Sequence, residues 1–328
     1  MDKRKKKGRL LFVHIFALVS LSMMVFKSFV AAQEYNRFRT FHFSNNSSDN
    51  RHPRFSGGIY SVWGDAGEQL WLVYDSKLDS GNTEIFTSVR FRDENFWRDP
   101  LRLTDNVFRD EYPVVKHVNE NTIVVWQTNR RDNFDLMFSV FDGNNWKEPE
   151  FITDSKSDDI HPELLVHQIY EYPQTDTVVV ILVWERDQKL YWNQYSEAGW
   201  NLPKAVTNDS TNQTNPFLFG FENTISMAWE RNKYGNVDIF GSWLDSETNE
   251  WVVPIQLTES EFEDRNPSLV QGYQEMGLIW QSNRDGDFDL YSRGWRQDKD
   301  SILLSDPVSL TENDSSDVDA YTLLIPHG

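Results

Sequence analysis

The chain contains no cysteine among its 328 residues. This absence excludes disulfide bonds, thiolate metal sites, a cysteine nucleophile and a lipid anchor attached to cysteine. It is compatible with export, because a chain of this length can bury a core large enough to fold without disulfides.

Basic residues are scarce: 32 Lys and Arg stand against 51 Asp and Glu, for a formal net charge of -19. A surface this acidic repels phosphate backbones and anionic lipid head groups. We therefore predict no nucleic-acid partner, and membrane contact only through the N-terminal segment. Cations and basic partners remain compatible with the charge, as does a role of the acidity in solubility.

Long hydrophobic runs are limited to Leu10–Phe26, which follows a basic segment and precedes Val30 and Ala32. Small residues at these two positions fit cleavage after Ala32, so we predict a signal peptide at residues 1–32. An uncleaved membrane anchor is the alternative, since a span needs about 17–25 residues. Either interpretation predicts that the rest of the chain is exported, to a periplasm, a cell surface or the medium.

Residues 33–52 form a polar segment rich in Asn and Ser. Within it, residues 37–44 alternate polar with aromatic side chains, which predicts a strand that closes the fold. We therefore divide the chain into residues 1–32, the polar segment at 33–52 and a repeat domain at 53–328.

A motif of Pro, two variable residues, an aliphatic residue and Thr recurs five times in the repeat domain. Its threonines are Thr104, Thr153, Thr207, Thr258 and Thr311. Nine residues after each Thr stands a proline or, once, an alanine: Pro113, Pro162, Pro216, Pro267 and Ala320. Tandem self-similarity at about 50 residues is typical of repeat architectures.

Each unit is predicted to hold four short strands, the second of which ends at an aromatic residue that packs between units: Tyr74, Trp126, Trp184, Trp229 and Trp280. No long amphipathic helix pattern appears. Four-stranded units in tandem predict an all-β fold, a β-propeller with five blades at 53–104, 113–153, 162–207, 216–258 and 267–311. The alternative is six blades, with residues 37–44 and 320–325 contributing to an incomplete one.

The run from Trp280 to Tyr291, WQSNRDGDFDLY, resembles the repeat of TolB-type, WD-like β-propellers. Copies at 126–138 and 229–240 match less fully, and the Ser-Pro-Asp-Gly turn usual in that family is absent. The resemblance implies the propeller fold and leaves the function open, because such propellers are binding scaffolds with diverse partners.

Acidic residues recur three positions before the repeated proline or, in the last copy, alanine: Asp110, Asp159, Asp264 and Asp317. The loops that carry them and the hairpins after the second strands emerge on the same face of a propeller. One interpretation is a ring at the channel mouth that concentrates cations or meets a basic partner. The other is that each Asp accepts backbone N–H bonds in its own turn.

Arginines follow the second-strand aromatic residue at Arg130, Arg231 and Arg284. They are candidates to bind carboxylates or sugars, with salt bridges to neighbouring Asp residues as the alternative. Asp285, Asp287 and Asp289 alternate like part of a calcium loop, although the downstream Glu of an EF-hand is missing. Ca²⁺ is the one cofactor that the sequence suggests, and structural hairpin bonds are the alternative.

Neither a nucleophile elbow nor a zinc-protease motif nor a phosphate loop occurs, and the histidines are scattered along the sequence. Polar residues that recur in every blade favour binding, because catalysis needs one asymmetric site. We therefore predict an exported, non-enzymatic propeller that recognises a protein or a glycan through its acidic loop face. The alternatives are a propeller-type glycoside hydrolase or sialidase-like enzyme, and a lectin with repeated sugar sites between blades.

Overall fold

The computed structural model describes residues 49–57, 69–91, 96–118, 120–169, 177–233, 235–271, 275–298, 301–311 and 316–317. All of them belong to the larger of two compact units, Asn46–Gly328. The predicted signal peptide and the predicted strands at 37–44 and 320–325 lie outside the described residues. Within the described ranges, no helix has the length and apolar character to cross a membrane.

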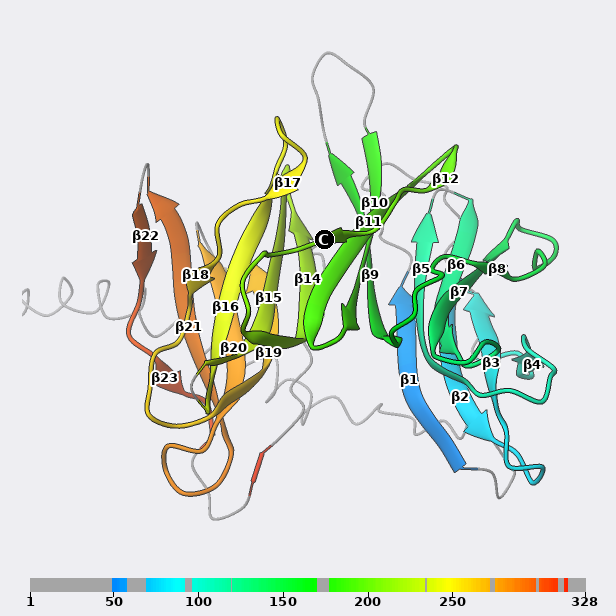
Figure 1. Cartoon of the computed structure of the whole chain (residues 1–328), viewed down its shortest axis with the longest axis horizontal. Helices are drawn as coiled ribbons and strands as arrows, with labels where there is room; N and C mark the ends of the chain where they lie inside the picture. The colour runs from blue at the N-terminus through cyan, green and yellow to red at the C-terminus, as the bar shows by residue number, and fades with distance from the viewer. Residues whose placement is uncertain are drawn as a thin grey trace, which may run out of the picture. The chain divides into compact units, whose positions relative to one another are not determined.

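Five antiparallel sheets follow one another along the described chain, and each is one blade (Figure 1). Blade 1 contains β1 (Asp49–Gly57), β2 (Gln69–Lys77), β3 (Thr83–Phe91) and β4 (Leu101–Arg102). Blade 2 contains β5 (Asp110–Val118), β6 (Asn121–Thr128), β7 (Asp135–Phe141) and β8 (Glu150–Phe151). Blade 3 contains β9 (Asp159–Ile169), β10 (Thr177–Arg186), β11 (Lys189–Ser196), β12 (Gly199–Trp200) and β13 (Lys204–Ala205).

Blade 4 contains β14 (Asn212–Phe221), β15 (Thr224–Lys233), β16 (Asn236–Asp245), β17 (Glu250–Trp251) and β18 (Ile255–Gln256). Blade 5 contains β19 (Asp264–Gln271), β20 (Met276–Ser282), β21 (Asp289–Asp298), β22 (Ser301–Leu304) and β23 (Val308–Ser309). In blades 3 to 5 the outermost strand is split in two, and both parts pair with the third strand. The prediction of a five-bladed, four-stranded β-propeller is confirmed.

The second strand of each blade is buried on both sides, because consecutive side chains point into the two neighbouring blade interfaces. In β6, Ile123 and Val125 pack towards blade 3, whereas Val124 and Trp126 pack towards blade 1. The second-strand tryptophans of blades 2 to 5 each join the apolar cluster shared with the preceding blade: Trp126, Trp184, Trp229 and Trp280. Their predicted position between blades is confirmed.

The threonine of the repeat motif fastens the fourth strand to the third. The side-chain oxygen of Thr104 accepts a hydrogen bond from the Ile85 backbone N–H at 2.9 Å. The same bond recurs in blades 2, 4 and 5, with Thr153, Thr258 and Thr311 as acceptors. The motif is therefore explained by one buried bond that the short outer strand needs.

The innermost strands begin three or four residues before the prolines at which we predicted the blades to start. The residue before each proline adopts a left-handed backbone with φ near 50°: His52, Tyr112, His161, Asn215 and Asn266. At these positions the pairing with the second strand shifts register, which marks a β-bulge. The predicted boundaries were wrong because the sequence does not reveal this extra residue.

Candidate active site

The loops between blades and the hairpins after the second strands lie on one face, as the pairing of strand ends shows. Asp110 at the start of β5 pairs with Thr128 at the end of β6, and Asp264 in β19 pairs with Ser282 in β20. We call this side the loop face. The predicted acidic residues and the predicted arginines both lie at or near the loop face.

Asp110, Asp159 and Asp264 are fully buried at the loop face, each bonded to the tryptophan and an arginine of its own blade. Asp159 accepts hydrogen bonds from Trp184 Nε1 at 2.8 Å and from the Arg186 guanidinium at 2.6 and 2.7 Å. The corresponding partners of the other two are Trp126 with Arg130 and Trp280 with Arg284. These Asp–Trp–Arg triads support the blades from within, and their carboxylates do not reach the surface.

Blade 4 departs from this pattern, since Gln213 stands where the triads have Asp. Arg231 instead contacts Asp209 at 3.2 Å and the Thr211 hydroxyl at 2.7 Å. Asp317 keeps the backbone geometry of the repeat: its N–H donates to the Phe288 carbonyl at 2.6 Å, as that of Asp159 does to Phe134.

Two of the three predicted calcium residues have separate hydrogen-bond partners, and the buried Oδ2 of the third, Asp287, has none among the described residues. Asp289 accepts a hydrogen bond from Thr311 Oγ1 at 3.0 Å, and Asp285 accepts one from the Tyr291 hydroxyl. Among the described residues, no group of three His, Asp or Glu side chains is arranged to hold a metal ion. The bond to Thr311 agrees with the structural alternative for Asp289, and calcium binding stays a prediction.

A different set of side chains meets where the innermost strands begin. The five left-handed residues before the prolines come from five blades, and their side chains form two groups in contact: His52 with Tyr112 and His161, and Asn215 with Asn266. The rings of His52 and Tyr112 stack with centroids 3.7 Å apart, and Tyr112 meets His161 edge-on at 4.6 Å. Asn215 donates through its amide to the amide oxygen of Asn266.

Carboxylates from the ends of the second strands hold these residues in place. Because each bulged residue leaves the strand ladder, its N–H is free to donate to the preceding blade. The N–H of Asn215 donates to Glu185 at 2.9 Å, and that of Asn266 donates to Glu230 at 2.8 Å. The N–H of Tyr112 lies 3.3 Å from the carboxylate of Asp75.

The histidines join the same network. His52 Nδ1 lies 2.6 Å from the Asp75 carboxylate, and His161 Nδ1 lies 3.4 Å from that of Glu185. We call the following eight residues the central cluster: His52, Asp75, Tyr112, His161, Glu185, Asn215, Glu230 and Asn266. One line of contacts runs through it from blade 1 to blade 5.

Glu163 lies on β9, two residues after His161. It shares a side of blade 3 with Glu185, since Val183 pairs with Glu163 and Glu185 stands two positions after Val183 on the same strand. Burial raises the pKa of the Glu163 carboxyl, and the charges of Lys116 and Arg54 act in the opposite direction. A raised carboxyl pKa is a property of the general acid in glycosidases.

Asp75 and Glu185 differ in how far their carboxylate oxygens are exposed. Asp75 is fully buried, whereas the Glu185 side chain is 11% exposed. Glu185 Oε1 receives the N–H of Asn215, and its other oxygen has no protein partner among the described residues. The site therefore combines a carboxyl with a raised pKa, an oriented carboxylate with one open oxygen, and aromatic and amide side chains that can contact a sugar.

The central cluster was not predicted from the sequence. The residues before the prolines differ in type from blade to blade, so they carry no repeated side chain, and the histidines looked scattered. The residue after each second-strand aromatic was the available signal, because it is polar in every copy: Asp75, Gln127, Glu185, Glu230 and Gln281.

No family model matches the chain, and no curated protein does. The resemblance to TolB-type propellers therefore stays a prediction. Among solved structures, the chain is similar to the α-L-arabinanase of Penicillium chrysogenum in complex with arabinobiose, with a TM-score of 0.52 and 10% identity over 80% of this chain and 93% of that one.

A thermostable family-43 glycoside hydrolase matches with a TM-score of 0.44 and 11% identity, covering 83% of this chain and 97% of that one. The Bombyx mori β-fructofuranosidase matches with a TM-score of 0.44 and 12% identity, covering 87% and 69%. At these identities the likeness shows the propeller fold alone. The arabinanase is named as an enzyme, which contradicts our prediction of a non-enzymatic binding module and agrees with the alternative of a glycoside hydrolase.

Proposed function

We propose that this protein is an exported glycoside hydrolase that binds a carbohydrate at the central cluster. The observation that carries the proposal is the convergence of five left-handed residues, from five blades, on carboxylates oriented by backbone N–H groups. Backbone strain of this kind needs firm support from its surroundings and clusters at functional sites.

In this proposal Glu163 is the general acid and Glu185 is the base or nucleophile. Glu163 transfers its proton to the glycosidic oxygen as the bond to the anomeric carbon breaks. If Glu185 acts as a base, its open oxygen takes a proton from the water that attacks the anomeric carbon. The raised pKa of the Glu163 carboxyl suits the acid role in this division of labour.

The neighbouring residues have supporting roles. The Asn215 N–H and His161 fix the orientation of Glu185. The rings of Tyr112 and His52 provide a flat surface against which the apolar face of a sugar can pack. Lys116 and Arg54 stabilise the Glu163 carboxylate that forms when its proton has been transferred.

The test is hydrolysis by the purified protein of arabinan, xylan, fructan and a panel of aryl glycosides. We expect activity on at least one of them, and a loss of kcat of about 100-fold or more in Glu163→Gln and in Glu185→Gln, which is the usual contribution of acid–base catalysis. Glu197→Gln is the matched control, because Glu197 is an exposed carboxylate of the same blade. Full activity in both central variants, or no hydrolysis of any substrate, contradicts the proposal.

A further inference from the structure

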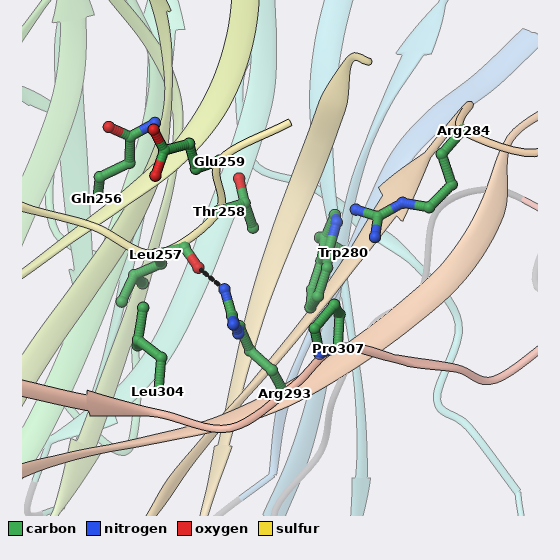
Figure 2. A pocket seen from close by; sticks show the side chains of 9 residues that line it. All are labelled: Gln256, Leu257, Thr258, Glu259, Trp280, Arg284, Arg293, Leu304 and Pro307. Atoms are coloured by element: carbon green, nitrogen blue, oxygen red, sulfur yellow. Dashed lines mark hydrogen bonds between the residues drawn. The ribbon is translucent and has the colours of Figure 1, made fainter. Parts of the chain in front are cut away.

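A cavity of about 300 Å³ opens between blades 4 and 5, beside β18 and β21 (Figure 2). None of its lining residues belongs to the central cluster. Its size is at the lower end of the range for small-molecule sites, enough for a ligand of about one sugar unit.

The cavity lies where blade 5 departs from the other blades. In blades 2 to 4 a tryptophan three residues before the motif proline packs into the interface with the preceding blade: Trp146, Trp200 and Trp251. Blade 5 has Leu304 at this position, and Leu304 lines the cavity. It pairs with Trp295 as Trp251 pairs with Leu244, so the position is equivalent. The smaller side chain leaves room at the interface.

A second departure brings a cation to the same place. The third strands of the other blades carry Ser88, Ser139, Asn193 and Ser242, each of which donates to a carbonyl of the chain that follows the third strand. Blade 5 has Arg293, whose Nε and Nη2 donate to the Ser305 carbonyl at 2.9 and 2.6 Å. Its Nη1 reaches across the interface to the Leu257 carbonyl at 2.7 Å, as Figure 2 shows.

The guanidinium of Arg293 is half-buried, and its bonds go to neutral carbonyls. Among the described residues, no carboxylate lies within ion-pair distance of it. Burial lowers the pKa of Arg293; Arg284, which also lines the cavity, lowers it further, whereas Asp306 and Asp264 raise it. A half-buried positive charge without an ion-pair partner favours an anionic ligand.

The remaining walls distinguish a sugar acid from a simple anion. Gln256 and Glu259, both exposed, offer polar atoms on the blade 4 side, where sugar hydroxyl groups can bond. Leu304 and Pro307 form an apolar wall on the blade 5 side. We infer that this cavity binds a uronic acid, whose carboxylate pairs with Arg293 and whose hydroxyl groups contact Gln256 and Glu259. The inference does not depend on catalysis at the central cluster.

Two substitutions test the site by giving blade 5 the residues of its sister blades. Arg293→Ser keeps a donor for the outer carbonyl and removes the charge, and Leu304→Trp fills the cavity. The probes are D-galacturonate and D-glucuronate, with D-galactose, D-glucose and acetate for comparison, and binding is measured by calorimetry and ligand-observed NMR. Arg296→Ser is the control, since Arg296 is an exposed arginine of the same strand.

We expect one of the uronates to bind the wild type and Arg296→Ser equally, and to bind both blade 5 variants at least tenfold more weakly. The neutral sugars and acetate are expected to bind at least tenfold more weakly than that uronate. Binding unchanged in Arg293→Ser, equal binding of acetate, or no binding of either uronate overturns the inference. A lower melting temperature of Arg293→Ser without any uronate binding also overturns it, because the guanidinium then only clamps the two blades.

Discussion

The Asp–Trp–Arg triads and the central cluster both draw one set of residues from each of several blades. They differ in whether the side chain or the backbone conformation recurs. The triads repeat side chains: the same three residue types form the same bonds in blades 2, 3 and 5. In the central cluster the backbone conformation recurs, because a left-handed residue precedes the proline of each innermost strand. Its side chain varies between His, Tyr and Asn. The first arrangement makes identical supports, and the second makes one asymmetric site.

The largest effect is expected from breaking a triad. Asp159→Ala removes the acceptor of Trp184 Nε1 and leaves the partly buried Arg186 charge without its partner. Removing one partner of a buried ion pair destabilises by about 3–5 kcal/mol. Urea unfolding followed by tryptophan fluorescence measures the loss. Glu148→Ala, at an exposed position of blade 2, should change stability by less than about 0.5 kcal/mol. Equal midpoints for the two variants would show that the triads do not support the blades.

We expect a smaller effect on stability, together with a loss of activity, when one central-cluster residue is replaced by its counterpart from another blade. His161→Asn inserts the residue of blades 4 and 5, which tolerates the left-handed backbone. Stability should change by about 1 kcal/mol or less, while the contacts to Tyr112 and Glu185 are lost. We expect kcat/KM on the substrate identified for the wild type to fall about 10- to 100-fold, which corresponds to about 1.4–2.7 kcal/mol. Unchanged kcat/KM would remove His161 from the proposed site.

The pH dependence of the unfolding free energy tests the contribution of Asp238, a buried carboxyl of blade 4. Burial raises the pKa of Asp238 to about 6. The hydrogen bond from the Ser260 N–H opposes this shift, and the charges of Asp264 and Glu259 add to it. A carboxyl whose folded pKa lies above its unfolded pKa stabilises the fold at low pH, and this contribution is lost as the pH rises from about 4 to about 6. Relative to Asp238→Asn, the wild type should therefore lose unfolding free energy across this range. Parallel pH profiles of the two proteins would contradict the raised pKa.

The smallest expected effect concerns the shortened hairpin of blade 3. Asp187 and Gln188 both have positive φ and connect β10 to β11 in a two-residue turn. Turns of this type favour Gly at the second position. Gln188→Gly should stabilise the protein by about 0.5–1 kcal/mol and leave hydrolysis unchanged. A lower unfolding midpoint would indicate that the Gln188 side chain contributes more than the relieved backbone.

Much of the fold was predictable from the sequence because blade packing repeats. The aromatic residue at the end of the second strand and the Thr of the motif recur at fixed spacing since every interface needs them. Five blades, the strand order and the shared loop face follow from that spacing. The β-bulge was not predictable, because no glycine marks the left-handed position, and the blade boundaries were therefore set too late.

The candidate site was less predictable for a related reason. Asp110, Asp159 and Asp264 looked like a ring because they repeat, yet repetition marked them as supports. Glu163 and Glu185 fall on neighbouring strands with nothing in their spacing to connect them. Their relation becomes visible only when strand pairing places them on the same side of blade 3. Arg293 and Leu304 each differ in type from the residues at the equivalent positions of the other blades. The strand pairing is needed to identify those positions.

The sequence by itself determined the architecture, because hydrophobic periodicity and a repeated outer-strand bond are local properties of the chain. The tertiary structure decided which polar residues are buried supports and which meet at the centre. It did so because a β-bulge turns the backbone N–H groups of Tyr112, Asn215 and Asn266 out of the ladder, towards a carboxylate of the preceding blade. That contact joins residues about 30 to 40 positions apart in the chain, and no local pattern encodes it.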